Sequence, residues 1–254
     1  MNISQFISFL EQFDLKIEGL GELSRLADKF GSDKGFQGGK GHLYTQFYEK
    51  LTKNIRYEKF TLVEIGLLSA HHQTNFDRLG YKEMYAREQG QTYYDYPSLE
   101  MWAEFFPFAR ILGLDKEKFV IDEHDRRIEF KYFNAENPST IAQILGDLGP
   151  KVILDDASHI YKHQQDTFFN AFHYLAPGGI YIIEDLNSIQ GNFVEGYEPT
   201  EKIFIGGDKT LRTSPSYLAN PDKGEHILSL IEGMNFSMSL QSGKLNTVCI
   251  KKRG

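Results

Sequence analysis

Residues 151–186 read KVILDDASHIYKHQQDTFFNAFHYLAPGGIYIIEDL, and this stretch decides the fold class. It contains two short apolar runs, VIL near its start and IYII near its end, which predict two buried strands. Between them, apolar residues recur at helical spacing from residue 160 to residue 175, which predicts a helix. Strand, helix and strand in this order are typical of parallel strands joined by a right-handed crossover. The stretch therefore predicts an α/β fold.

The same alternation extends towards the N-terminus. Further strands are predicted at residues 60–66 (FTLVEIG), 109–115 (ARILGLD) and 128–134 (IEFKYFN). Helical patterns follow these strands at residues 98–106, 116–122 and 138–148. Five strands that alternate with helices predict a doubly wound, mostly parallel sheet.

Both ends of the chain add elements to this sheet. Helical spacing at residues 3–13, 22–30 and 42–55 predicts an N-terminal helical extension. A last helix is predicted at residues 224–234, and an antiparallel hairpin at residues 235–240 and 246–252. We therefore expect seven strands in a single domain, with a helical cap at residues 1–58 and a core at residues 59–254.

Two segments interrupt the alternation, near residues 69–97 and 187–224. Both follow the carboxyl ends of predicted strands, where open α/β sheets bind ligands. The first segment is rich in tyrosine, which suits stacking against sugar faces but also ordinary packing. Each segment is therefore either a lid or wall of a pocket, or an insertion packed on the surface of the fold.

Composition and charge exclude several functional classes. The chain has 254 residues, of which 41% are hydrophobic and 25% charged, as in ordinary globular proteins. Its formal net charge of -7 argues against a nucleic-acid-binding protein. There is no apolar run of about 18 residues and no basic leader, so we expect a cytoplasmic protein without membrane contact. The single cysteine, Cys249, cannot form an internal disulfide and is expected to be a buried thiol without a chemical role.

Acidic residues gather at the ends of two predicted strands that neighbour each other in sequence. Asp155 and Asp156 follow the fourth strand, and Glu184 and Asp185 follow the fifth. Carboxylates crowded in a crevice repel one another unless protons, basic partners or a hard cation compensate their charge. Oxygen-only ligands from Asp156, Glu184 and Asp185 suit Mg²⁺ better than zinc. The alternative is that these residues only cap the segments that follow them.

His159 lies three residues beyond Asp156, at the predicted start of a helix. An unperturbed histidine titrates near pH 6.5, so His159 is a candidate general base that is partly neutral at cellular pH. His163 lies one turn further along and is expected to face away from the strand ends, which makes it the weaker candidate.

The first two strands also end in candidate ligand-binding residues. Gly66 permits a tight turn beside a ligand, but the residues after it do not complete a GxGxxG fingerprint. A nicotinamide-dependent oxidoreductase is therefore disfavoured. Asp115 ends the second strand and could accept hydrogen bonds from ribose hydroxyls or cap the helix that follows.

These motifs resemble those of class I S-adenosylmethionine-dependent methyltransferases. The resemblance is to the metal-dependent sugar O-methyltransferases of macrolide biosynthesis, typified by the mycinamicin enzyme, and to the related cephalosporin-hydroxylase-like group. It covers residues 26–187 and rests on GSDKG, HLYTQFY, VEIG, SLEMWAEFFPFARILGLD, VILDDASHIYKHQQDTF and LAPGGIYIIEDL. It implies a Rossmann-like fold that uses S-adenosylmethionine and Mg²⁺.

The resemblance also implies roles for individual residues. Asp156, Glu184 and Asp185 would hold Mg²⁺, and His159 would be the base. The residues expected to contact the cofactor are Lys34, His42, Glu64, Gly66, Ser98, Asp115, Asn134 and Asp155. The chain departs from the family at Tyr96-Pro97, where two glycines are usual, and at 134–136, where Asn-Ala-Glu replaces Gly-Asp-Gln. Asn134 or Glu136 could still accept a hydrogen bond from the adenine amino group.

The expected function is Mg²⁺-dependent methyl transfer to a hydroxyl of a sugar, glycoside or other polyhydroxylated small molecule. Two alternatives remain: an oxidoreductase on a Rossmann sheet, and a non-catalytic protein whose acidic cluster holds a structural cation. The sequence leaves the oligomeric state open, a homo-oligomer included.

Overall fold

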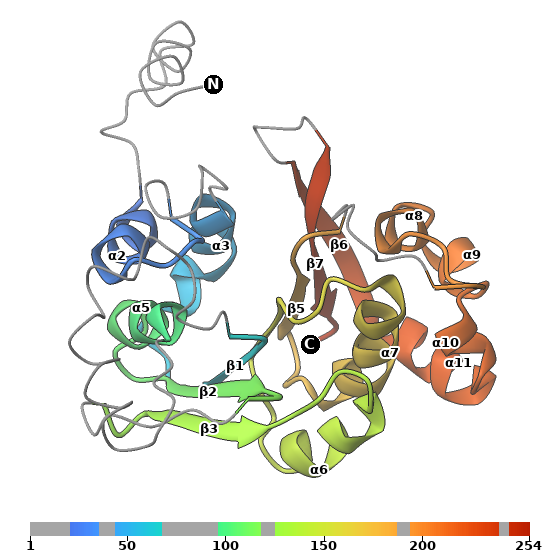
Figure 1. Ribbon diagram of the computed structural model, residues 1–254, viewed down its shortest axis with the longest axis horizontal. Coiled ribbons are helices and arrows are strands. Elements are labelled where there is room, and N and C mark those ends of the chain that lie inside the picture. Colours follow the sequence, from blue (N-terminus) through green and yellow to red (C-terminus); the bar gives the residue numbers. More distant parts are fainter. Residues whose placement is uncertain (1–20, 36–43, 68–95, 118–124, 187–193, 239–243) are drawn as a thin grey trace, which may run out of the picture.

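The computed structural model of the chain describes residues 21–35, 44–67, 96–117, 125–186, 194–238 and 244–254. Its centre is a seven-stranded sheet with the order β3-β2-β1-β4-β5-β7-β6 (Figure 1). The strands are β1 (Thr61–Ile65), β2 (Arg110–Asp115), β3 (Ile128–Tyr132), β4 (Val152–Asp155), β5 (Ile180–Ile183), β6 (Ile231–Met238) and β7 (Leu245–Lys252). The first five pair in parallel, and β7 lies antiparallel to both of its neighbours, β5 and β6. The predicted α/β sheet with a C-terminal hairpin is therefore confirmed.

Helices cover both faces of the sheet. One face carries α2 (Glu22–Phe30), α3 (Tyr44–Thr52) and α5 (Pro97–Phe105), and the other carries α6 (Ile141–Leu145), α7 (Tyr161–Ala171) and α11 (Pro221–Leu230) (Figure 1). Single 3₁₀ turns are η2 (Lys53–Ile55), η3 (Pro138–Thr140) and η4 (Phe172–Tyr174). Because the inner parallel strands β1, β2, β4 and β5 are buried on both faces, their sequences are almost continuously apolar, whereas the edge strand β3 is partly exposed.

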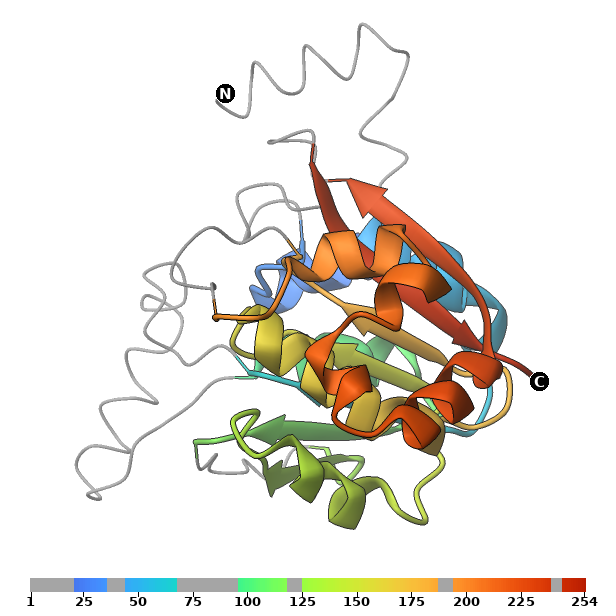
Figure 2. The same cartoon turned by 90° about the vertical axis from the view of Figure 1, so that its right-hand side faces the viewer.

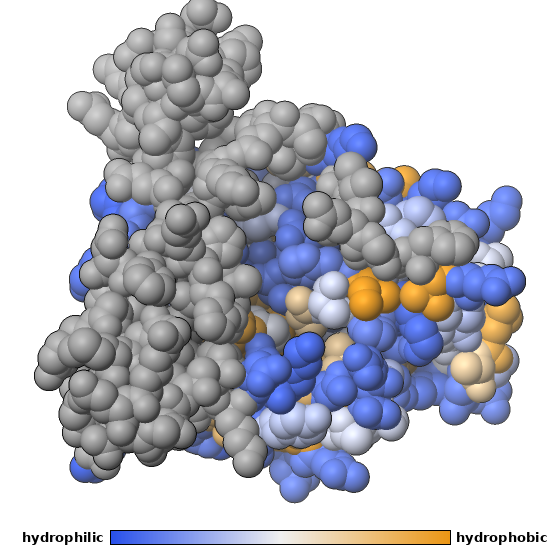
Figure 3. All heavy atoms as spheres, in the orientation of Figure 1, coloured by the Kyte–Doolittle hydropathy of each residue, from blue (hydrophilic) through white to orange (hydrophobic). Residues whose placement is uncertain are grey.

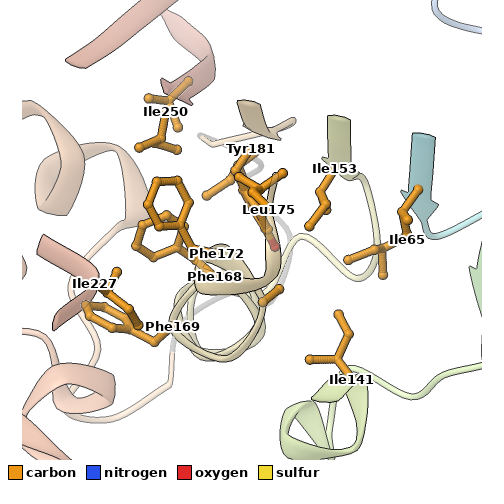
Figure 4. Packing of buried hydrophobic residues seen from close by; sticks show 14 of the residues in the cluster. Ile65, Ile141, Ile153, Phe168, Phe169, Phe172, Leu175, Tyr181, Ile227 and Ile250 are labelled. Atoms are coloured by element: carbon orange, nitrogen blue, oxygen red, sulfur yellow. The ribbon is translucent and has the colours of Figure 1, made fainter. Parts of the chain in front are cut away.

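Side chains alternate between two hydrophobic clusters along each central strand. Leu62, Ile111 and Leu154 point towards α5, whereas Val63 and Ile153 point towards α7. Figure 4 shows the second cluster, in which the aromatic side chains of α7 fill the space between the sheet, α6 and α11. Cys249 belongs to the first cluster and is fully buried, which raises the pKa of its thiol to about 12. The expectation that Cys249 is buried is confirmed.

The segment at 187–224 is expected to be either a lid or pocket wall, or a packed insertion, and its described residues 194–224 pack on the fold. They form α8 (Thr200–Ile205), α9 (Asp208–Leu211), α10 (Pro215–Leu218) and the start of α11, beside α7 (Figure 2). Ile203, Phe204 and Leu211 are buried in the same cluster as α7. The alternative of a packed insertion therefore holds for this part of the segment.

The helix predicted at residues 224–234 ends earlier than expected. In the structure, α11 stops at Leu230, and Ile231 already pairs with Lys252 as the start of β6. The apolar pattern continues through this boundary, because Ile227 and Leu228 of the helix and Ile231 of the strand are buried in the same hydrophobic cluster. Periodicity alone therefore could not locate the change. Among the other predicted elements, the helix at residues 3–13 and most of the one at residues 116–122 lie outside the described residues.

None of the described helices combines the length and the apolar character that crossing a membrane requires. On the face drawn in Figure 3, most described surface residues are hydrophilic, and hydrophobic ones occur in small groups.

Gly66, directly after β1, has a positive φ of 88° and lies against the turn that follows β4. A Cβ atom here would lie 2.3 Å from the carbonyl oxygen of Asp156. We expect Gly66→Ala to lower the free energy of unfolding by about 2–4 kcal/mol, since it adds an unfavourable backbone conformation and a backbone clash. Gly149→Ala is the matched control, because Gly149 also has a positive φ (51°) but open space around it. Its cost should be about 1 kcal/mol. Equal losses in urea unfolding would show that the close contact does not matter.

Candidate functional site

A cavity of about 470 Å³ lies at the carboxyl ends of the parallel strands. Its wall includes one residue at or just after the carboxyl end of each of the five parallel strands: Gly66, Asp115, Asn134, Asp156 and Glu184. Open α/β sheets bind ligands at this edge. The topology therefore brings together residues that span 119 positions of the sequence, from 66 to 184.

Lys34 lies at the centre of the acidic cluster. Its side chain is only 2% exposed, and its Nζ lies 2.5 Å from Asp156 Oδ2, 2.9 Å from Glu184 Oε1 and 3.7 Å from Glu64 Oε1. Burial alone would lower the pKa of Lys34, but these carboxylates raise it well above its ordinary value. A basic partner therefore compensates part of the negative charge that the sequence predicts here.

Asp156, His159 and Asp185 form a second group at the cavity. His159 Nε2 lies 2.9 Å from Asp156 Oδ1, and its Nδ1 lies 3.4 Å from Asp185 Oδ2. One ligand atom from each of the three residues falls within 4.8 Å of the others, which is the spacing of a candidate metal site. The imidazole thus bridges two carboxylates from neighbouring strands.

The two carboxylates change the protonation of His159. Burial lowers the pKa of His159, but its hydrogen bond to Asp156 and the charges of Asp156 and Asp185 raise the pKa to about 9. Burial likewise raises the pKa of Asp156, but Lys34 and His159 together lower it to about 2. The expectation that His159 titrates near pH 6.5 is therefore wrong, because the two carboxylates favour the protonated imidazolium at neutral pH.

His159 and Asp185 both have positive φ angles, of 57° and 52°. This left-handed conformation is uncommon for residues other than glycine and costs about 1 kcal/mol or more. His159 lies in the segment after β4 and Asp185 in the segment after β5, and both residues line the cavity. Backbone strain thus coincides with the candidate site.

Four of the predicted cofactor-contacting residues are buried outside the described wall of the cavity: Lys34, Glu64, Ser98 and Asp155. Glu64 accepts a hydrogen bond from Trp102 Nε1 at 2.9 Å. Burial raises the pKa of Glu64 to about 7, although the charge of Lys34 and a hydrogen bond with Ser98 lower it. Asp155 accepts a hydrogen bond from Tyr181 at 2.9 Å, and burial raises its pKa to about 7 as well. Glu64, Ser98 and Asp155 therefore support the cavity from behind in this structure, as Lys34 does.

Asp115 and Asn134 line the cavity as expected. Asp115 Oδ2 accepts a hydrogen bond from the backbone N–H of Leu67 at 2.7 Å, and Oδ1 accepts one from Glu117 at 2.9 Å. The carboxylate therefore closes its own turn and also fixes the chain after β1. Asn134 Oδ1 accepts a bond from the N–H of Glu136 at 3.0 Å.

The remaining histidines give mixed results. His163 also lines the cavity, with its Nδ1 2.7 Å from Ser158 Oγ, so the expectation that it faces away is wrong. Burial and Lys162 lower the pKa of His163. His42, expected to contact the cofactor, lies outside the described residues.

Three residues of the site were not found from the sequence. Tyr44 Oη donates a hydrogen bond to Asp185 Oδ1 at 2.5 Å, and Asn246 Nδ2 donates one to Tyr44 Oη. Gln164 Nε2 donates one to the backbone carbonyl of Glu184 at 2.9 Å. Tyr44 and Asn246 are more than 200 positions apart. Tyr44 and Gln164 lie within HLYTQFY and VILDDASHIYKHQQDTF, two of the motifs that carry the resemblance, and this is the sequence signal that could have found them.

The donor set fits a hard divalent cation. Asp156, Glu184 and Asp185 offer carboxylate oxygens at the cavity, and oxygen ligands are those that Mg²⁺ prefers. His159 adds a nitrogen that could bind the cation or remain a base. The side chain of Glu184 is only 2% exposed, so Asp156 and Asp185 are the more accessible carboxylates, with 16% and 27% of their side chains exposed.

Curated proteins with similar sequences are sugar O-methyltransferases. The mycinamicin VI 2''-O-methyltransferase of Micromonospora griseorubida is 32% identical over 168 residues, which are 65% of this chain and 36% of that protein. The 8-demethyl-8-(2-methoxy-alpha-L-rhamnosyl)-tetracenomycin-C 3'-O-methyltransferase of Streptomyces olivaceus is 29% identical over 187 residues, 71% of this chain and 42% of that protein. The chain thus spans about two fifths of the length of these relatives. No protein-family model matches it.

Solved structures with the same fold include MycE, the methyltransferase of the mycinamycin biosynthetic pathway. Its complex with Mg and SAH has a TM-score of 0.64 and 22% identity, covering 99% of this chain and 60% of that one. Its complex with Mg, SAH and mycinamycin VI has a TM-score of 0.62 and 19% identity, covering 100% and 63%. The resemblance predicted from the motifs is confirmed by the sequence relatives, and the fold is that of the Rossmann-like methyltransferases.

Proposed function

From this similarity to sugar O-methyltransferases, we propose that the chain transfers a methyl group from S-adenosylmethionine to a hydroxyl of a sugar, glycoside or other polyhydroxylated small molecule, with Mg²⁺ at the site. The observation that carries the proposal is the Asp156–His159–Asp185 group, which lies on the wall of a cavity at the carboxyl edge of a methyltransferase fold. The sugar O-methyltransferases named above support the choice of acceptor.

The cofactor would occupy the part of the cavity beside β1, β2 and β3. Gly66 brings the backbone close to the ligand there, and Asp115 retains acceptor capacity for ribose hydroxyls beyond its two backbone bonds. Asn134 and Glu136 lie on the same wall and would meet the adenine. S-adenosylmethionine, when bound, supplies an activated methyl group. The protein's task is then to position the acceptor and take up its proton.

The acceptor hydroxyl would lie beside Asp156 and Asp185. When bound there, Mg²⁺ supplies a Lewis acid that orients the hydroxyl and lowers its pKa. We assign His159 as the proton acceptor, because its imidazole lies between Asp156 and Asp185, where the hydroxyl would bind. For that role it must first lose the proton that the two carboxylates hold on it.

A calorimetric titration with S-adenosylhomocysteine tests the class of enzyme. We expect binding with a dissociation constant of micromolar order, about −8 kcal/mol. NAD at the same concentrations should not bind, because the chain lacks the glycine fingerprint. Binding of NAD without binding of S-adenosylhomocysteine would favour the oxidoreductase instead. Binding of Mg²⁺ with neither nucleotide would favour the non-catalytic protein.

Metal binding should release the proton of His159. Since carboxylates raise the pKa of this histidine to about 9, it is charged below pH 9, and a cation that replaces the proton competes with it. Mg²⁺ affinity should therefore rise from pH 7 towards pH 9. Calorimetry at pH 7.5, in two buffers that differ in ionisation enthalpy, counts the protons released. His159→Gln should release about one proton fewer than the wild type.

His163→Gln is the matched control for this measurement. His163 lines the same cavity, but burial lowers its pKa, so it carries no proton to release at pH 7.5. Its proton count should equal that of the wild type. An unchanged count in His159→Gln would contradict a protonated imidazole between the two carboxylates.

A further inference from the structure

We propose that Tyr44, held by Asn246, is a positioning residue that sets which oxygen of Asp185 is presented to the metal. The proposal rests on the metal site of the proposed function. Its basis is a chain of two hydrogen bonds, from Asn246 Nδ2 to Tyr44 Oη and from Tyr44 Oη to Asp185 Oδ1. The other oxygen of Asp185, Oδ2, lies 3.4 Å from His159 Nδ1.

The direction of the chain is fixed by its members. The amide nitrogen of Asn246 can only donate, so the Tyr44 hydroxyl accepts there and gives its own proton to Asp185. A carboxylate that accepts such a bond through one oxygen is held against rotation. Oδ1 is thereby turned to the tyrosine, and Oδ2 is left for the candidate metal group.

Asp185 needs this support because its backbone is strained. Its φ of 52° is in the left-handed region, and 27% of its side chain is exposed. Asn246 also holds the adjoining residue, because its backbone carbonyl accepts a bond from the N–H of Leu186 at 3.1 Å. Strand β7 thus holds the end of β5 both through the backbone and through Tyr44.

Tyr44 is itself rigidly placed. Only 5% of its surface is exposed, and its ring stacks on that of Tyr48 at 6.1 Å with an angle of 13° between the planes. Tyr48 in turn packs against Trp102, whose indole donates to Glu64. The hydroxyl of Tyr44 is therefore presented from a fixed aromatic column, and the packing of the ring does not depend on the hydroxyl.

The test is Mn²⁺ binding to the full chain, measured by calorimetry without cofactor or substrate. Tyr44→Phe removes one hydroxyl and keeps the stacked ring. Loss of a residue that orients a metal ligand weakens affinity by about 10- to 100-fold, and we expect a loss in this range. Asn246→Ala should weaken binding less, since it leaves the tyrosine hydroxyl in place but free to rotate.

Tyr181→Phe is the matched control. It also removes a buried hydroxyl that donates to an aspartate, but that residue is Asp155, outside the candidate metal group. Its Mn²⁺ affinity should equal that of the wild type. A Tyr44→Phe variant whose Mn²⁺ affinity is within twofold of the wild type would overturn the positioning role but not the metal site. Equal losses of Mn²⁺ affinity in Tyr44→Phe and Tyr181→Phe would do the same. If the wild-type protein binds no Mn²⁺, the metal site and the positioning role are both overturned. The enzyme class is still tested separately by S-adenosylhomocysteine binding.

Discussion

Lys34→Met should lower the free energy of unfolding by about 3–5 kcal/mol at pH 8, because it leaves buried carboxylates without their cation. Lys34 is the cation in contact with Glu64, Asp156 and Glu184, and its side chain is 2% exposed. Methionine keeps much of the volume of the lysine, so the change removes charge rather than packing. Urea unfolding followed by circular dichroism measures the loss.

The loss should be smaller at low pH. Burial already raises the pKa of Glu64 to about 7 and that of Glu184 well above its ordinary value, and removing Lys34 raises both further. An acid whose pKa is higher in the folded state destabilises the fold increasingly as pH rises above its unfolded pKa of about 4.3. At pH 5.5 these carboxylates take up protons, so the variant should recover part of its stability.

Lys29→Met is the matched control for this substitution. Lys29 also pairs with a carboxylate, at 2.6 Å from Glu104, but the two side chains are 56% and 45% exposed. Exposed pairs of this kind contribute about 0–1 kcal/mol. Similar losses in the two variants, or a loss in Lys34→Met that does not vary with pH, would contradict a cluster held together by Lys34.

His159→Gln should lower the rate of methyl transfer by about 10²- to 10⁴-fold, the usual contribution of a general base. Glutamine can still form a hydrogen bond to Asp156 but cannot take up a proton. S-adenosylhomocysteine affinity should remain unchanged, because the proposed cofactor residues lie on other strands. Single-turnover rates with a glycoside acceptor across pH 6–9.5 provide the measurement.

The pH profile separates His159 from its neighbour. If His163 is the base, His163→Gln abolishes the pH dependence and His159→Gln retains it. His163 is hydrogen-bonded to Ser158 and has a lowered pKa. If His163 were the base, the rate of methyl transfer would therefore level off with its transition below pH 6.5. A His159→Gln variant with most of the wild-type rate would show that another group accepts the proton.

The sequence predicted the central sheet well, because its strands are buried on both faces. Runs such as TLVEI and VILD have few polar residues, so their limits follow from where the apolar run stops. The residues at or just after the carboxyl ends of the parallel strands were predicted to share one edge, and Gly66, Asp115 and Asp156 do share the cavity. Strand order at the carboxyl edge is therefore enough to place much of a site.

The sequence did not predict what surrounds those residues. Lys34 follows a surface helix in sequence, and nothing in its local pattern indicates that it is buried among carboxylates from three strands. The raised pKa of His159 arises from the distance to Asp156 and Asp185, which spacing along the chain does not give. Tyr44 and Asn246 meet only because β7 inserts beside β5. Such features depend on tertiary contacts rather than on periodicity.

The contact at Gly66 joins the turns on the two sides of the cavity. The N–H of Asp156 donates to the carbonyl of Ile65, and the N–H of Gly66 donates to that of Leu114, the residue before Asp115, both at 2.8 Å. The metal-side turn and the cofactor-side turns thus share one backbone network with no space between them. We expect a ligand that shifts one turn to alter the free energy of binding at the other, and any such coupling free energy is reciprocal. Whatever factor the cofactor imposes on the dissociation constant of Mg²⁺, Mg²⁺ imposes on that of the cofactor.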